Sequence, residues 1–250
     1  METGTTAAFL DHLFVLAFAV VYPTVGFFSF RRLVRDVAAG HSPERLKLYL
    51  QTIAGQWLLL GIGLVLWSSH DRELSGLGFS LVVDANFAVA AAIAVAAIAF
   101  LVAQGRAVRK ASANELRDVT RSLGDMGHLL PRTRRELHRF YLVGVTAGIC
   151  EEVLWRGFLL WYLQLLMPMW AAVLLATLWF GAAHAYQGAE FIPRVTLVGA
   201  VLMMLFLLTG SLLIPVIVHI AVDVLQGRLA YDVLSRQALL GPTEAADDRD

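Results

Sequence analysis

Two adjacent carboxylates, Glu151 and Glu152, lie inside a long apolar run of this 250-residue chain. Ionisable groups are costly in such a run, and they are usually kept because they bind or exchange something. Arg156 follows Glu152 by four residues, which on a helix places both on one face as an ion pair. Glu151 points about 100° away from that face. We therefore expect Glu151 to face a cavity and to take part in proton exchange or ion binding, unless all three residues only lock helices together.

Two later apolar runs each carry a histidine. His184 lies four residues after Phe180, so the aromatic ring can brace the imidazole. His219 lies four residues before Asp223, whose carboxylate can hydrogen-bond the ring and fix its tautomer. Each motif alone also fits a clamp between packed helices. Because the three motifs reach compatible depths along their runs, we expect them to share one cavity.

Hydrophobic residues make up 58% of the chain and charged residues 16%, which exceeds the apolar share of a soluble domain. Several runs approach the ~20 apolar residues that cross a bilayer. The fold class predicted is all-α, a polytopic transmembrane helical bundle. Pro23 and Gly26 predict a kink in its first helix. The expected spans, about seven in number, cover residues 8–30, 49–68, 84–104, 140–165, 170–187, 194–210 and 212–229.

The distribution of basic residues predicts the orientation. Lys and Arg gather after the first and third spans, near Arg194 and in the C-terminal tail, whereas the opposite side receives only Arg72. The positive-inside rule then places the N-terminus outside and the C-terminus in the cytoplasm. The net charge of zero gives no argument for a nucleic-acid partner, and the single cysteine excludes an intrachain disulfide.

The chain divides by composition into three parts. Residues 1–139 hold the N-terminal spans and a basic connector, residues 140–230 hold the polar motifs, and residues 231–250 form a cytoplasmic tail. The connector over 106–139 fits either a helix on the membrane surface or a solvated linker. We expect the acidic end, 241–250, to be disordered. Asp11 should face the outer membrane interface.

In order along the chain, Glu151-Glu152-x-x-x-Arg156, Phe180-x-x-x-His184 and His219-x-x-x-Asp223 resemble the motifs of the CPBP family. This family includes the type II CAAX prenyl endopeptidases and related bacteriocin-processing or immunity proteins. The resemblance covers residues 140–230. It implies an intramembrane endopeptidase whose helices surround a cavity open toward the cytoplasm. It also implies that Glu151 and His184 activate water, and that His219 and Asp223 stabilise an oxyanion or bind a ligand.

The last motif departs from the eukaryotic prenyl proteases, which carry Asn where this chain has Asp223. An ionised Asp cannot donate a hydrogen bond to an oxyanion, so Asp223 must be protonated, orient His219 or bind a metal. Nitrogen and oxygen donors of this kind suit Zn²⁺, although no tight zinc-binding spacing is present. The metal-ligand set under this hypothesis is Glu151, His184, His219 and Asp223; a metal-free, glutamate-dependent mechanism is the alternative.

These observations predict hydrolysis of a peptide bond in a membrane-embedded or lipid-anchored substrate. A prenylated CAAX-type protein and a leader peptide are both compatible with the resemblance. The expected location is the bacterial cytoplasmic (inner) membrane. A proton- or ion-coupled transporter is an alternative because midspan acids and histidines also form relays, although no inverted repeat is evident. A non-catalytic membrane scaffold is the third possibility.

Overall fold

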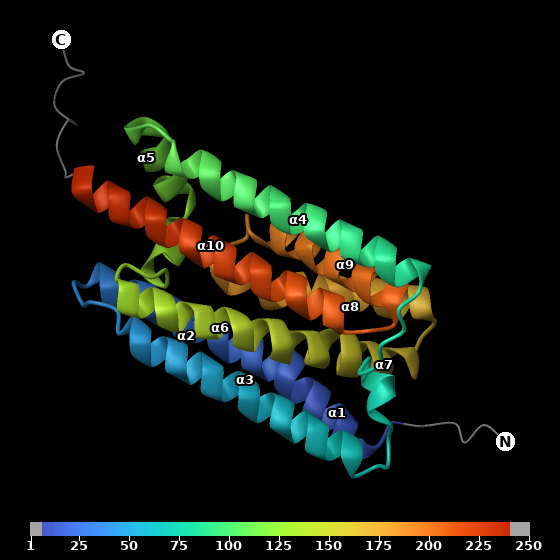
Figure 1. Ribbon diagram of the computed structural model, residues 1–250. Helices are drawn as coiled ribbons and strands as arrows, with labels where there is room; N and C mark the ends of the chain where they lie inside the picture. Colours follow the sequence, from blue (N-terminus) through green and yellow to red (C-terminus); the bar gives the residue numbers. More distant parts are fainter. Residues whose placement is uncertain (1–6, 241–250) are drawn as a thin grey trace.

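The structure is a computed structural model that describes residues 7–240. Over that range the chain is helical and contains no strand, and its long helices run side by side (Figure 1). The predicted all-α bundle is therefore confirmed. The α-helices are α1 (Phe9–Val15), α2 (Tyr22–Ala38), α3 (Arg45–Ser68), α4 (Ala85–Arg109), α5 (Ala113–Ser122), α6 (Arg134–Glu152), α7 (Leu160–Gln164), α8 (Met169–Ala183), α9 (Ile192–Thr209) and α10 (Leu213–Leu240).

Several helical segments are long and apolar enough to cross a membrane, and the protein is an integral membrane protein. These 6 candidate spans are Phe9–Ala38, Arg45–Ser68, Ala85–Arg109, Met169–Gln187, Ile192–Thr209 and Leu213–Leu239. The predicted span 140–165 corresponds to α6 and α7, which a π-helical turn over Val153–Leu159 joins into one helix. This helix carries the charged motif and packs between α3 and α10. The count of seven spans and the orientation of the termini stay predictions.

A second π-helical turn, Leu16–Val21, interrupts the first span between α1 and α2 and ends two residues before Pro23. Proline has no N–H, so it cannot donate to the carbonyl of Ala19 four residues earlier. The indole of Trp179 on α8 donates to that carbonyl instead, at 2.9 Å. The Ala19 carbonyl near Pro23 thus accepts a hydrogen bond that joins the first span to α8.

Two glycines bring α6 and α10 into close contact. A Cβ atom at Gly144 would lie 2.9 Å from Cβ of Asp223, and one at Gly148 would lie 2.9 Å from the backbone nitrogen of Ile220. Small residues at this four-residue spacing are the usual means by which membrane helices approach closely. The contact matters for function because Glu152 lies one helical turn beyond Gly148, on the same face.

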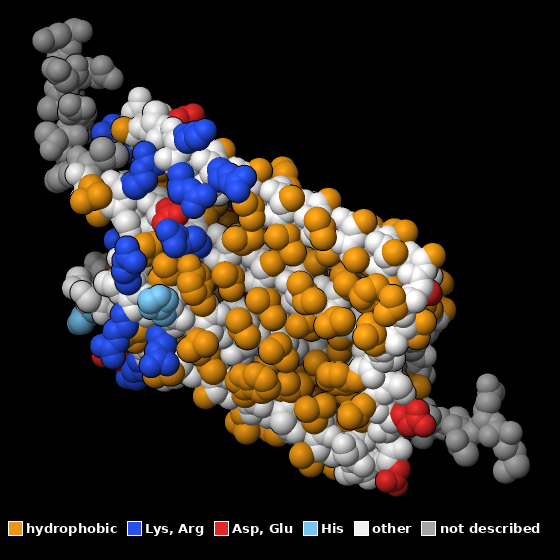
Figure 2. Space-filling view, in the orientation of Figure 1, with side chains coloured by type: hydrophobic (Ala, Val, Ile, Leu, Met, Phe, Trp, Pro, Cys, Tyr) orange, Lys and Arg blue, Asp and Glu red, His pale blue; other side chains and the backbone are white. Residues whose placement is uncertain are grey.

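Lys and Arg side chains gather at one end of the bundle (Figure 2). The connector at this end contains α5, which packs against α10 and buries Leu116 completely. Arg236 on α10 donates to the backbone carbonyls of Val108 and Ala111 at the end of α4. The connector is therefore a packed element rather than a free linker. Residues 231–240, predicted as tail, continue α10, and 241–250 lie outside the described residues.

A buried ion pair closes the other end of the first span. Arg72 donates two hydrogen bonds to the Asp11 carboxylate, at 2.8 and 2.6 Å, and its guanidinium lies over the rings of Trp161 and Trp67. Asp11 is completely buried. The expectation that Asp11 faces the membrane interface is therefore wrong, because Arg72 folds back over the end of the helix and neutralises it.

Candidate active site

Glu152 and Arg156 form the buried centre of the site. Arg156 Nη1 donates to Glu152 Oε1 at 2.8 Å, and Arg156 Nη2 donates to the carbonyl of Gly199 on α9 at 3.1 Å. Glu152 is 0% exposed and Arg156 2%. The pairing predicted from their spacing is present, although Arg156 lies within the π-helical turn rather than a regular helix. The pair also links α6 to α9.

His219 on α10 is held by Glu152. Its Nδ1 lies 2.7 Å from Glu152 Oε1, and a carboxylate accepts hydrogen bonds, so Nδ1 carries the hydrogen. The other ring nitrogen, Nε2, lies 3.8 Å from Asp223 Oδ2, which is beyond hydrogen-bond range. The four-residue spacing predicted that Asp223 would fix the tautomer of His219. The structure gives that contact to Glu152, because α6 and α10 approach closely at Gly148.

Glu151 lies on another side of α6 and forms a separate pair. Its Oε1 accepts a hydrogen bond from Gln56 Nε2 at 2.8 Å, and its Oε2 lies 3.7 Å from His184 Nε2. His184 Nδ1 lies 2.7 Å from the carbonyl of Phe180, so Nδ1 carries the hydrogen and Nε2 is free to accept one. No donor in the described part of the chain bonds Glu151 Oε2. Two acceptor atoms therefore face each other.

Phe180 packs between the Glu152–His219 pair and the Glu151–His184 pair. The guanidinium carbon of Arg156 lies 4.2 Å from the centre of its ring, and the ring centres of His184 and His219 lie at 4.7 and 6.2 Å. A Cβ atom at Gly199 would lie 2.8 Å from the Phe180 ring, so glycine makes room for it. The supporting position predicted for Phe180 thus agrees with its contacts to all three polar side chains.

The two pairs differ in their access to the surroundings. The side chains of Glu151 and His184 are each 16% exposed and that of Asp223 is 32% exposed, whereas that of Glu152 is 0% exposed. The Glu151–His184 pair is thus partly exposed, although Glu151 Oε2 itself is buried, whereas in the Glu152–His219 pair only His219 keeps a small exposed area, 8% of its side chain. The structure brings together all seven residues singled out from the sequence, through contacts among α6, α8, α9 and α10.

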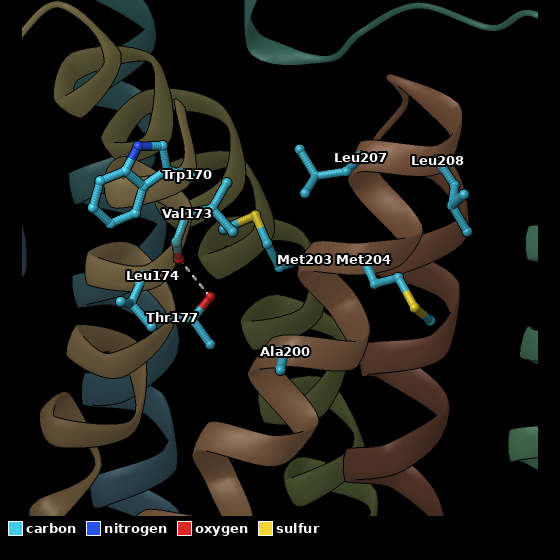
Figure 3. A pocket seen from close by; sticks show the side chains of 9 residues that line it. All are labelled: Trp170, Val173, Leu174, Thr177, Ala200, Met203, Met204, Leu207 and Leu208. Carbon is cyan, nitrogen blue, oxygen red and sulfur yellow. Dashed lines mark hydrogen bonds between the residues drawn. The ribbon is translucent and has the colours of Figure 1, made fainter. Parts of the chain in front are cut away.

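Two apolar grooves lie near these helices. The larger, about 440 Å³, runs between α8 and α9 and is lined by residues such as Trp170 and Leu207; none of the site residues borders it (Figure 3). Its Thr177 hydroxyl donates to the Val173 carbonyl, so that polar atom is satisfied within α8. The smaller groove, about 270 Å³, lies between the first span and α8 and ends at Tyr186, whose ring faces His184 at 6.0 Å.

The residues predicted to hold zinc do not form one ligand set. Over residues 7–240, no three His, Cys, Asp or Glu side chains lie close enough together to hold a metal ion. His184 is directed to Glu151, whereas His219 is directed to Glu152. In the structure these residues form two separate acid–imidazole pairs, and a zinc centre stays a prediction.

Sequence reasoning missed Gln56, which bonds Glu151 from the second span. The signal was available, because an amide side chain within an apolar span needs a buried partner. It also missed Gly144-x-x-x-Gly148, a spacing typical of close helix contacts. Neither signal names the partner helix.

Comparison with known protein families gives a match for the segment that carries the site. Residues 133–225 match the family model described as type II CAAX prenyl endopeptidase Rce1-like. No curated protein and no solved structure matches the chain. The matched segment contains all three polar motifs, together with α6, α8, α9 and the first part of α10. Over residues 133–225, the chain is thus similar to the type II CAAX prenyl endopeptidases of the Rce1-like family, a family of membrane proteases.

Proposed function

We propose that the protein is an intramembrane endopeptidase in which a water molecule held between Glu151 and His184 is the nucleophile. The observation that carries the proposal is the 3.7 Å separation of Glu151 Oε2 from His184 Nε2. This separation is too long for a direct hydrogen bond, but one water about 2.8 Å from each atom would bridge them. Both atoms are acceptors, and a water molecule has two hydrogens to donate.

In the proposed reaction Glu151 is the general base. It takes one proton from the water while His184 accepts a hydrogen bond from the other, and the oxygen adds to the scissile carbonyl carbon. A tetrahedral intermediate results. Glu151 then returns its proton to the amide nitrogen, the C–N bond breaks, and a carboxyl group and an amine are released.

His219 is proposed to stabilise the oxyanion of that intermediate. Because Glu152 accepts the hydrogen on Nδ1, a protonated ring presents Nε2–H to the developing charge. Asp223, at 3.8 Å from Nε2, would pair with the imidazolium before the substrate binds. Glu152 and Arg156 hold the ring in place. No step passes through a metal, because the donor atoms do not converge on one point.

The proposed substrate is a membrane-embedded or lipid-anchored peptide, either a prenylated CAAX-type protein or a leader peptide. The family match and the apolar surroundings of the site support this class. We propose the bacterial cytoplasmic membrane as the location, because Asp223 departs from the Asn of the eukaryotic prenyl proteases; the basic end of the bundle would face the cytoplasm.

Glu151→Gln tests the proposal. The purified protein would be assayed in lipid vesicles with two fluorogenic peptides, a farnesylated CAAX-type peptide and an unprenylated leader peptide. We expect the wild type to cleave at least one, and the variant to lose about 10²–10⁴-fold in kcat, since general base catalysis contributes that much. The thermal unfolding temperature should not change, because a glutamine oxygen still accepts from Gln56.

Glu190→Gln serves as the matched control, because Glu190 is exposed, and this variant should retain activity. Wild-type turnover by Glu151→Gln would refute the assignment. Metal analysis of the same sample, with chelation and readdition of Zn²⁺, tests the zinc expectation.

A further inference from the structure

Gln56 lies outside the segment that matches the family, yet it contacts the proposed general base. It belongs to α3, and its side chain is buried with 7% exposure inside an apolar span. Its Nε2 donates to Glu151 Oε1 at 2.8 Å. The N-terminal half of the chain therefore supplies a polar group to a site whose other members all come from residues 151–223.

The backbone around Gln56 is held on both sides. Trp57 donates from its indole to Thr146 Oγ1 on α6, at 3.2 Å. A Cβ atom at Gly55 would lie 3.1 Å from Tyr22 Oη, so glycine lets α2 pack closely against α3. These contacts fix the position from which the Gln56 amide reaches Glu151.

The orientation of the amide follows from hydrogen-bond chemistry. An ionised carboxylate only accepts, so the NH₂ group of Gln56 must face Glu151. Its Oε1 is then buried without a hydrogen-bond partner among residues 7–240. A buried, unpaired amide oxygen costs stability. A residue serving only to join α3 to α6 would not need to leave this oxygen unpaired, and Trp57 already joins these helices.

We infer that Gln56 is a positioning residue for Glu151; the inference rests on the proposed function. By bonding Oε1, Gln56 restricts rotation of the carboxyl group, so that Oε2 stays opposite His184. Misplacement of a catalytic group by about 1 Å can cost two orders of magnitude in rate. Gln56 touches neither the water nor the substrate in this scheme.

Gln56→Met tests the inference, because methionine keeps the length of the side chain and removes the donor. We expect kcat for the cleaved fluorogenic peptide to fall about 10- to 100-fold, the range expected for a hydrogen bond to a charged group. KM should stay within about twofold. Gln51→Met is the matched control, since Gln51 is exposed on the same helix, and it should leave both constants unchanged.

A second variant separates positioning from folding. Glu151→Asp withdraws the carboxylate by one methylene, out of reach of the amide. In that background Gln56→Met should cause no further loss of kcat, whereas a structural role would lower activity in both backgrounds.

The outcomes distinguish the two proposals. If the wild type cleaves and Glu151→Gln does not, but Gln56→Met keeps the wild-type kcat or changes only KM, the positioning role is wrong and the proposed function stands. If the wild type and Glu151→Gln cleave the peptides equally, the proposed function is wrong, and the positioning role of Gln56 is then wrong as well.

Discussion

Two buried carboxylate–arginine clusters at different places in the bundle differ in how their carboxylate oxygens are hydrogen-bonded. In the cluster of Asp11 and Arg72, both carboxylate oxygens accept hydrogen bonds, from Arg72 and from the backbone N–H of Ala8. Indole rings cover the guanidinium. In the cluster around Glu151 and Glu152, each carboxylate instead leaves one oxygen, Oε2, without a partner in the described residues.

This difference indicates that the Asp11–Arg72 cluster is structural and that the cluster around Glu151 and Glu152 is reactive. Both oxygens of the Asp11 carboxylate are bonded, so it has no free acceptor to offer a third molecule, and the pair acts on stability. An open cluster carries the cost of buried, unpaired acceptors, and such groups in native proteins call for an explanation. Here the explanation proposed is that the free acceptor of Glu151 receives hydrogen bonds from the nucleophilic water.

Among the variants proposed to test this difference, the largest change in activity is expected for His184→Ala. The variant removes one of the two acceptors that hold the water, so kcat should fall by about 10²–10⁴-fold. Its unfolding temperature should stay close to the wild-type value, because the ring bonds only a carbonyl of its own helix. Steady-state cleavage and thermal unfolding in the same vesicles measure both. A large loss of stability with little loss of kcat would show that His184 has a structural role, like the Asp11–Arg72 pair, and not a catalytic one.

The opposite behaviour is expected for Asp11→Asn. Removing one charge leaves Arg72 buried without a counter-charge, which typically costs about 3–5 kcal/mol in the free energy of unfolding. Denaturant titration in mixed micelles measures this, and kcat per folded molecule should be unchanged. The double variant Asp11→Leu with Arg72→Met should regain much of the stability, since no charge is left unpaired. If Asp11→Asn instead abolished cleavage in the folded protein, the two clusters would not be functionally separate.

A smaller effect is expected for Gly148→Ala. The added Cβ meets the backbone of Ile220, so α6 and α10 must separate, at a cost of about 1–3 kcal/mol in stability. Separation also lengthens the contact of Glu152 with His219, so kcat should fall by roughly tenfold, the equivalent of 1.4 kcal/mol. Gly105→Ala is the control, because nothing lies within 4 Å of its added Cβ. Equal effects of the two substitutions would show that the close approach of α6 and α10 is unimportant.

The sequence by itself determined the class of fold and the members of the candidate site. Apolar runs of membrane-crossing length predict helices whatever their packing, because backbone polar groups in lipid must be satisfied within the helix. A four-residue spacing places Glu152 with Arg156 and Phe180 with His184 through local geometry alone. Ionisable residues in such runs are conspicuous because their burial is costly.

Only the tertiary structure decided which partners these residues have. The contact of His219 with Glu152, rather than with its helical neighbour Asp223, follows from the close approach of α6 to α10. Gln56 reaches Glu151 because α3 packs against α6. Periodicity along one helix fixes the face on which a side chain lies, but the identity of the facing residue depends on which helices pack together and at what register.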